Sequence, residues 1–406
     1  MEINKIWLGK AAKKLVIGLG LGVILFLGWA GLTGKIKSDL LTPLGSKKTK
    51  SVKKEEKVVM GFLPTWMVGR ARMYTNQVNR LVFLGIEVDE EGSLVWEIQA
   101  KKLLGDDFKK QKELIKENGG KVILGLKQFE DNKLQRFIEN EEAMATMIGE
   151  VKELVETEKL DGVNIDFEFM GDPLAVTSDS FVDFMKKIKA AELGEVSVDV
   201  FANTVIKGDG QRINNLMNEI DQLVVMAYDF HGQGSDVSGP VAPIKANVGQ
   251  RSISELIENV GSKGVDYKKV VLAYPLYGYE WQTKGTEIGS ETVGGGRMVS
   301  LKEAVGYDEK EIKWDELSMT PWKEWDREVT KSRNVKVRLK SGKYRWQKQY
   351  YTETEYYQSF FENYKSLKAK LELASNSGVG GVGFWALGYE GKTDDWWKKF
   401  SEYYKK

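Results

Sequence analysis

Short apolar segments recur along most of the chain and alternate with helical patterns, which constrains the fold more than any other feature. One of the helical patterns lies at residues 144–155, where apolar side chains recur at three- and four-residue spacing, as on one buried helix face. Another helix is predicted after Ser252, which has capping-box spacing to Glu255 and can end at Gly264. The eight segments are Val58–Leu63, Arg80–Ile86, Lys121–Leu126, Asp161–Phe167, Val196–Asn203, Gln222–Tyr228, Val270–Pro275 and Gly380–Ala386. Eight strand–helix units predict a parallel (β/α)8 barrel, with a doubly wound open sheet as the alternative.

The spacing breaks once, between the segments that end at Pro275 and begin at Gly380. This gap is far too long for one crossover. Within it, residues 334–351 alternate in polarity on both sides of Ser341-Gly342-Lys343, which is a hairpin pattern. We therefore expect a small β-rich insertion, at about residues 282–355, between the seventh and eighth strands.

The amino-terminal part divides into three segments before the barrel. A basic tail, residues 1–14, precedes an uncharged apolar run at residues 15–34 that is long enough to cross a bilayer as a helix. Residues 35–57 are lysine-rich and polar, as in a flexible linker. We expect a membrane anchor followed by an extracytoplasmic barrel at 58–406, secreted if the anchor is instead a cleaved signal peptide.

Composition excludes several classes of chemistry. The chain has no cysteine, so it can form neither disulfides nor thiolate sites, and His231 is its single histidine. With 60 basic and 59 acidic residues the net charge is +1, so no global field recruits nucleic acid, and we expect no such partner. We also expect a monomer that needs no metal or other cofactor.

The segment "DGVNIDFEF", residues 161–169, carries an unusual ladder of polar side chains. Val163, Ile165 and Phe167 alternate with Asn164, Asp166 and Glu168. In a barrel, the polar set would point into the lumen and Glu168 would emerge at the mouth, where active sites lie. Burial and like-charge repulsion raise the pKa of such a carboxyl, which suits a general acid for glycoside cleavage. The alternative is an inward salt-bridge network without a catalytic role.

The two acids lie on one strand and one face, so they are poorly placed to flank a sugar from opposite sides. Another nucleophile is then required. A substrate that carries an N-acetyl group could supply its own carbonyl oxygen, while Asp166 orients the amide N–H.

At this point the sequence resembles glycoside hydrolase family 18, the chitinase-like (β/α)8 enzymes, whose fourth strand carries Asp-Gly-x-Asp-x-Asp-x-Glu. Here the pattern reads Asp-Gly-Val-Asn-Ile-Asp-Phe-Glu, residues 161–168. "MAYDFHG" from Met226, "LAYPLYGYEW" from Leu272 and "GVGFWALGYE" from Gly381 are similar to the family's sixth, seventh and eighth strands, in order. The resemblance covers residues 58–400.

The resemblance implies a retaining glycosidase acting on GlcNAc-containing polysaccharide by substrate-assisted catalysis. Its implied catalytic residues are Glu168 as proton donor, Asp166 as orienting group and Tyr228 as hydrogen-bond donor to the acetamido group. The implied substrate contacts are Asn164, Asp229, Trp385, Tyr277 and Met226, with Trp385 stacking beneath the sugar.

Some positions depart from the family pattern. Asn164 stands where most of the family has Asp; in having Asn there, the sequence is similar to the cortex-lytic, cell-wall and chitobiase-like branch. Phe167 and Tyr279 stand where many chitinases have Trp and Arg. The third-strand "SxGG" signature is replaced by "LGLKQ", residues 124–128. These departures favour peptidoglycan or short chitin-type oligomers over crystalline chitin.

Two other classes of function remain open. A catalytically inactive lectin could share the fold, although lectin-like members typically lose the Glu that is retained here at 168. A carboxylate site for Mg2+ or Ca2+, built from Asp166, Glu168 and Asp229, would instead suit a phosphodiesterase.

Overall fold

The computed structural model describes residues 57–97, 100–391 and 395–404. The predicted anchor at residues 15–34, the tail before it and all of the predicted linker up to residue 56 lie outside this part. Within the described ranges, no helix combines the length and the apolarity that a membrane crossing needs.

Eight parallel strands close into a barrel, which confirms the predicted fold class and removes the open-sheet alternative. Closure follows from β1, which pairs with β2 on one side and with β14 on the other. A two-residue strand, β3 (Leu94–Val95), adds to β2 in antiparallel fashion. The barrel strands are β1 (Val58–Pro64), β2 (Arg80–Val88), β4 (Lys121–Gln128), β5 (Gly162–Phe167), β6 (Glu195–Phe201), β7 (Gln222–Met226), β8 (Val270–Pro275) and β14 (Gly381–Trp385).

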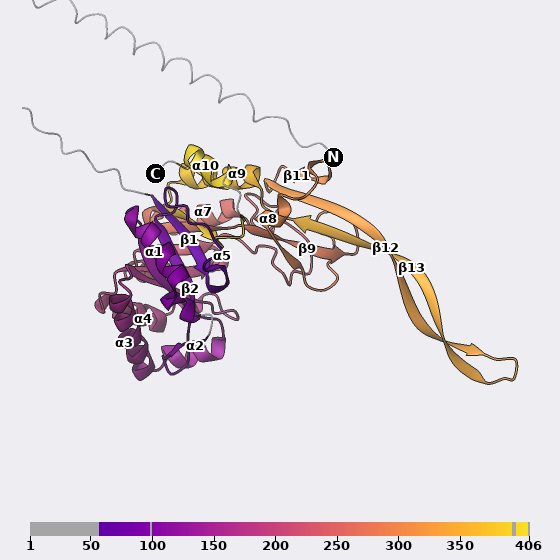
Figure 1. Cartoon of the computed structure of the whole chain (residues 1–406), viewed down its shortest axis with the longest axis horizontal. Coiled ribbons are helices and arrows are strands. Elements are labelled where there is room, and N and C mark those ends of the chain that lie inside the picture. Colours follow the sequence, from indigo (N-terminus) through magenta and orange to yellow (C-terminus); the bar gives the residue numbers. More distant parts are fainter. Residues whose placement is uncertain (1–56, 98–99, 392–394, 405–406) are drawn as a thin grey trace, which may run out of the picture. The chain divides into compact units, whose positions relative to one another are not determined.

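Helices in the connections surround the barrel (Figure 1). The predicted apolar face of residues 144–155 lies on α3, and Ser252 caps α7 by accepting a hydrogen bond from the Glu255 N–H. The helices are α1 (Asp106–Glu117), α2 (Asp131–Ile138), α3 (Glu141–Thr157), α4 (Asp179–Ala190), α5 (Ala202–Lys207), α6 (Gly210–Met217), α7 (Ile253–Ser262), α8 (Leu301–Ala304), α9 (Tyr364–Ser377) and α10 (Asp395–Tyr403), with short 3₁₀ segments at Thr65–Met67, Ala100–Leu104, Ala175–Thr177, Tyr267–Lys269 and Glu309–Glu311.

Alternation along each strand separates two apolar layers. Val163, Ile165 and Phe167 belong to the outer layer, where Phe167 stacks on Phe184 of α4 with ring centroids 5.9 Å apart. The lumen holds a smaller cluster: Met60, Phe62, Val82, Ile123, Val224, Val271 and Ala273. Polar side chains of β5 therefore share the lumen with a compact apolar plug.

Close strand contact explains the glycine at the start of β5. A Cβ on Gly162 would lie 2.1 Å from the Glu195 carbonyl oxygen on β6, so only glycine fits there. The preceding Asp161 accepts a hydrogen bond from the Val122 N–H at 2.8 Å and pairs with Lys116. Asp161 thus fixes the entry of β5 and lies at the opposite end of that strand from Glu168.

A five-stranded antiparallel sheet lies between β8 and β14 in the chain, where the insertion is predicted. Its order is β10-β9-β13-β12-β11, with β9 (Tyr277–Thr283), β10 (Arg297–Ser300), β11 (Lys313–Asp315), β12 (Thr320–Arg338) and β13 (Tyr344–Phe360). The predicted hairpin turns at Gly342, whose φ of +78° favours glycine. Strands β12 and β13 are longer than the alternating pattern indicates and project from the barrel as a two-stranded ribbon (Figure 1).

Candidate active site

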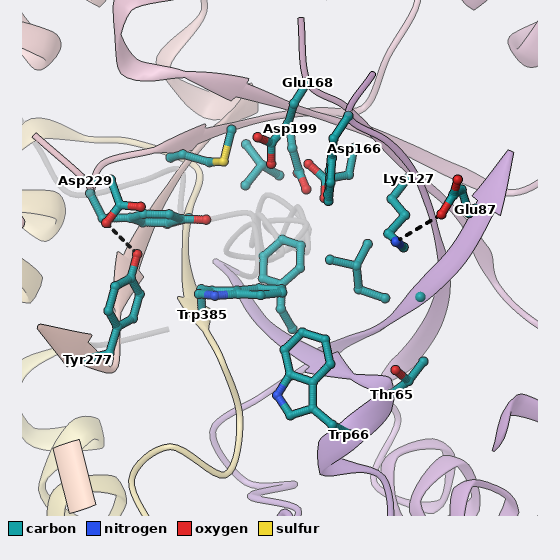
Figure 2. A pocket seen from close by; sticks show the side chains of 18 of the residues that line it. Thr65, Trp66, Glu87, Lys127, Asp166, Glu168, Asp199, Asp229, Tyr277 and Trp385 are labelled. Atoms are coloured by element: carbon teal, nitrogen blue, oxygen red, sulfur yellow. Dashed lines mark hydrogen bonds and ion pairs between the residues drawn. The ribbon is translucent and has the colours of Figure 1, made fainter. Parts of the chain in front are cut away.

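A cavity of about 450 Å³ opens at the carboxyl ends of the barrel strands. Its lining combines a row of carboxylates with aromatic rings, as Figure 2 shows. Of the residues predicted from sequence, seven line it: Asp166, Glu168, Met226, Tyr228, Asp229, Tyr277 and Trp385. The barrel therefore brings residues from β5, β7, the start of β9 and β14 to one place.

Asn164 is the exception among the predicted substrate contacts, because it lies beneath the cavity and does not line it. Its side chain is fully buried, and its Nδ2 donates hydrogen bonds to Ser197 Oγ at 3.0 Å and to Asp199 Oδ1 at 2.8 Å. Its own Oδ1 is buried without a hydrogen-bond partner among the described residues. Asn164 therefore holds the layer below the cavity in position.

Asp199, on β6, is a cavity residue that the sequence reasoning missed. It is 5% exposed, and burial raises the pKa of its carboxyl to about 8, against the hydrogen bond from Asn164, which lowers it. The segment "EVSVDVF", residues 195–201, contains the signal, because Ser197 and Asp199 alternate with valines. Strand β5 pairs with β6 with Asn164 opposite Ser197, so the polar faces of the two strands meet in the lumen.

Asp166 lies 4% exposed on the same face of β5. Burial raises the pKa of its carboxyl well above its usual range, and the neighbouring carboxyls of Asp199 and Glu168 act in the same direction. The ammonium group of Lys127 opposes this shift. Lys127 is itself paired with Glu87, with Nζ and Oε2 3.4 Å apart (Figure 2). The lumen carboxyls thus share protons and do not all ionise together.

Glu168 follows the last residue of β5 and is only half-buried at the cavity mouth. Burial raises its pKa to about 7, and the nearby carboxylate of Asp229 adds to the shift. Like-charge repulsion at Glu168 therefore comes from Asp229 across the cavity, and Glu168 in turn raises the pKa of Asp166. A carboxyl that keeps its proton up to about pH 7 can serve as a general acid.

Asp229 and Tyr277 form a pair at the other side of the cavity (Figure 2). Tyr277 Oη donates a hydrogen bond to Asp229 Oδ1 at 2.7 Å, and Asp229 itself has a φ of +55° just beyond β7. The surrounding protein raises the pKa of Asp229 to about 6, against the effect of this hydrogen bond. Burial raises the pKa of the Tyr228 hydroxyl well above its usual range, so this hydroxyl stays a donor.

Trp385, at the end of β14, spans the floor of the cavity (Figure 2). Its ring lies 6.1 Å from that of Phe62 and 6.3 Å, edge-on, from that of Trp66. Trp66 is 46% exposed at the rim. These rings offer flat apolar surfaces beside the carboxylates.

His231 lies in the loop after β7, and its Nδ1 is 2.9 Å from the Pro240 carbonyl oxygen. A Cβ on Gly239 would lie 2.7 Å from its ring, so the imidazole packs tightly against this loop. Among the described residues, no group of three or more His, Cys, Asp or Glu side chains is arranged to hold a metal ion.

A closed barrel with an acid ladder on β5 and an aromatic floor defines the class of (β/α)8 glycosidases. The sequence profile of "Glycosyl hydrolases family 18" matches residues 51–390, so the chain belongs to this family.

Curated relatives are distant and align in part. "Putative sporulation-specific glycosylase YdhD" of Bacillus subtilis is 28% identical over 159 residues, which are 38% of this chain and 35% of that protein. "Probable chitinase 10" of Drosophila melanogaster is 25% identical over 213 residues, 47% of this chain and 9% of that protein. The chain thus spans about a third or less of the length of these two relatives.

Solved structures share the fold at low identity. The spore cortex-lytic enzyme SleL of Bacillus cereus has a TM-score of 0.61 and 16% identity, covering 86% of this chain and 74% of that one. A family GH18 chitinase of Cycas revoluta, determined with (GlcNAc)4, has a TM-score of 0.67 and 16% identity, covering 85% of this chain and 99% of that one.

Proposed function

We propose that the protein is a retaining glycoside hydrolase that cleaves β-1,4 linkages after N-acetylglucosamine, with the substrate's acetamido oxygen as nucleophile. The observation that carries this proposal is the pair formed by Glu168 at the mouth and Asp166 behind it on one face of β5. The complex of a structural relative with (GlcNAc)4 is consistent with an N-acetylated substrate.

In the first step, Glu168 donates its proton to the glycosidic oxygen while the acetamido carbonyl oxygen attacks C1 and the bond to the leaving sugar breaks. Asp166 accepts the hydrogen bond of the acetamido N–H, and Tyr228 donates one to the carbonyl oxygen. The Glu168 carboxylate then takes a proton from water, which attacks C1 and opens the ring intermediate. Two displacements at C1 retain the anomeric configuration.

The other carboxyl at the mouth, Asp229, accepts the Tyr277 hydroxyl and raises the proton affinity of Glu168. This arrangement assigns Asp229 to tuning and substrate contact. Trp385 provides the surface on which the sugar that is attacked stacks.

The substrate that we propose is peptidoglycan or a chitin-type oligomer. The relatives support both, since a sporulation-specific glycosylase and a cortex-lytic enzyme stand beside chitinases. We further propose that residues 15–34 anchor the chain in a membrane with the barrel outside the cytoplasm. Protease accessibility of the barrel in intact cells would test this, because a cytoplasmic barrel would stay protected.

The test measures hydrolysis of a fluorogenic N,N′-diacetylchitobioside by the full chain and by its Glu168→Gln variant. Loss of the acid should lower kcat by about 100-fold or more, and a thiazoline that mimics the ring intermediate should inhibit the parent. Glu139→Gln, an exposed acid at the end of α2 and away from the cavity, is the matched control and should be unaffected. Glycan binding without turnover would instead identify a lectin.

A further inference from the structure

The ribbon formed by β12 and β13 is strongly basic, whereas the chain as a whole carries almost equal numbers of basic and acidic residues. Its distal part, residues 329–352, contains eight Lys and Arg and no Asp or Glu, whereas the whole chain has 60 basic and 59 acidic residues. The eight are Lys331, Arg333, Lys336, Arg338, Lys340, Lys343, Arg345 and Lys348. Such a segment attracts anions locally even though the protein as a whole is nearly neutral.

The strand register sorts these charges between two faces. Residues directly opposite each other in an antiparallel pair project from the same face. Arg338 pairs with Tyr344, Lys336 with Trp346, Asn334 with Lys348 and Ser332 with Tyr350. One face, which we call the aromatic–basic face, therefore carries three aromatic and three basic side chains: Lys336, Arg338, Tyr344, Trp346, Lys348 and Tyr350.

The side chains of this face are open to solvent. Tyr344, Trp346 and Tyr350 are 57%, 69% and 67% exposed, and Lys336 Nζ lies 5.0 Å from the centroid of the Tyr344 ring. Among the described residues, no ion pair joins Lys336, Arg338 or Lys348 to an acidic side chain. Large exposed aromatic rings interleaved with free cations mark an interaction surface and not a solvated sheet edge.

The same face of the sheet reaches the active-site cavity at its other end. Trp322 of β12 pairs with Phe360 of β13, which pairs in turn with Tyr279 of β9, and Tyr279 lines the cavity. Trp322 and Phe360 stack at 5.6 Å between ring centroids. By register, one face runs from the cavity wall to the ribbon, although the twist of a two-stranded ribbon turns it along the way (Figure 1).

We propose that the aromatic–basic face binds an anionic strand of the glycan substrate; this proposal rests on the proposed function. Such binding would select a carboxylate-bearing N-acetylglucosamine polymer of the peptidoglycan type over neutral chitin. The negative ring faces of Tyr and Trp suit the C–H bonds of a pyranose, while Lys and Arg pair with carboxylates. Neutral chitin would leave the basic side chains without a role.

The tip of the ribbon argues against insertion into the hydrocarbon of a membrane. Leu339 is followed by Lys340, Ser341, Gly342 and Lys343, so the turn is polar and basic. A ribbon that inserts into lipid needs an apolar tip. Continuity with the sugar cavity argues for glycan over nucleic acid.

The experiment measures co-sedimentation of the full chain, in neutral detergent, with insoluble peptidoglycan and with chitin, in a Glu168→Gln background that leaves the glycan intact. One variant removes the charges of the face, Lys336→Gln with Arg338→Gln and Lys348→Gln. A second removes its rings, Tyr344→Thr with Trp346→Thr and Tyr350→Thr. The matched control removes the same charge from the opposite face, Lys331→Gln with Arg333→Gln and Arg345→Gln.

We expect the Kd for peptidoglycan to rise about tenfold in both face variants and to change by less than about threefold in the control. Binding of the parent to peptidoglycan should exceed that to chitin and weaken with salt. Equal losses in the control and the charge variant would reduce the effect to net charge and overturn the proposal, as would unchanged binding.

Competition distinguishes the other partners. The competitors are oligo(dT), detergent micelles containing phosphatidylglycerol, and soluble glycan fragments. If oligo(dT) or the micelles displace the parent from peptidoglycan more effectively than the glycan fragments do, the partner is nucleic acid or lipid, and the proposal is overturned. Hydrolysis of the small chitobioside substrate, measured in proteins that retain Glu168, should be the same with and without the ribbon substitutions. Lack of that turnover would refute the proposed function, whereas normal turnover with unchanged peptidoglycan binding would refute only the role of the ribbon.

Discussion

Replacing Asp199 by Asn tests whether the barrel lumen holds a protonated carboxyl. The amide has nearly the same shape, and its oxygen can still accept the hydrogen bond that Asn164 Nδ2 now donates to Asp199 Oδ1 at 2.8 Å. The substitution therefore removes the titration and keeps the packing. Its effect on stability should depend on pH, and the loss of the Asp199 carboxyl should also lower the pKa of Asp166, which Asp199 now raises.

The sign and size follow from the pKa in the two states. Folding raises the pKa of Asp199 from 3.8 to about 8, so the folded protein retains a proton that the unfolded chain releases. The associated stability is fully present below pH 4 and is lost as the pH rises towards 8. Each pH unit in this window costs the parent about 1.4 kcal/mol, so between pH 5 and pH 7 it loses about 2–3 kcal/mol that the variant does not lose.

Urea unfolding of both proteins at pH 5, 6 and 7 measures this difference directly. Relative to the parent, Asp199→Asn should gain about 2–3 kcal/mol between pH 5 and pH 7. Ser197→Ala is the matched control, because Ser197 accepts the other Asn164 hydrogen bond and does not titrate. A constant difference between Asp199→Asn and the parent would show that Asp199 is ionised in the folded barrel, which would refute the reasoning.

Three further predictions concern catalysis and the core. Because Glu168 has a pKa of about 7 and must donate its proton, kcat/KM should fall about tenfold per unit above pH 7, and a plateau extending to pH 9 would contradict this acid. Trp385→Ala removes the cavity floor and should raise the KM for chitobioside about tenfold, measured by initial rates, with unchanged KM refuting the stacking role. Phe184→Ala removes a fully buried ring that packs on Phe137, Phe167 and Phe181. It should lower the free energy of unfolding, measured in urea, by about 3–5 kcal/mol, and a decrease below about 1 kcal/mol would contradict the packing described.

The barrel could be predicted from sequence because each strand is short, apolar and ended by a breaker residue. Asp166 and Glu168 stood out for a related reason, since three polar residues alternate within one segment. Asp199 did not, because the alternation of Ser197 and Asp199 with valines is a weaker pattern, and the pairing of β5 with β6 is what places Asp199 against Asn164. Register between strands is a property of the closed barrel and not of either segment.

The insertion shows the same limit. Alternation between residues 334 and 351 predicted the hairpin, but its base lacks a clear pattern, since Pro321 lies at one end and charged residues follow on β12. The strands extend to Thr320 and Phe360 because they pair with each other and with β9. Tertiary pairing thus sets the length of the ribbon where local sequence does not.

The number of residue pairs in the ribbon sets how far its tip lies from its base. Its 17 consecutive residue pairs, at about 3.3 Å each, give a reach of about 55 Å. Removing two residues from each strand would shorten this reach by about 7 Å and leave every remaining side chain on its own face, whereas removing one from each would exchange the faces beyond the deletion. Natural variation in this arm is therefore expected to come in steps of two residues per strand, so that the distance between the barrel and whatever the arm holds changes in increments of one pleat.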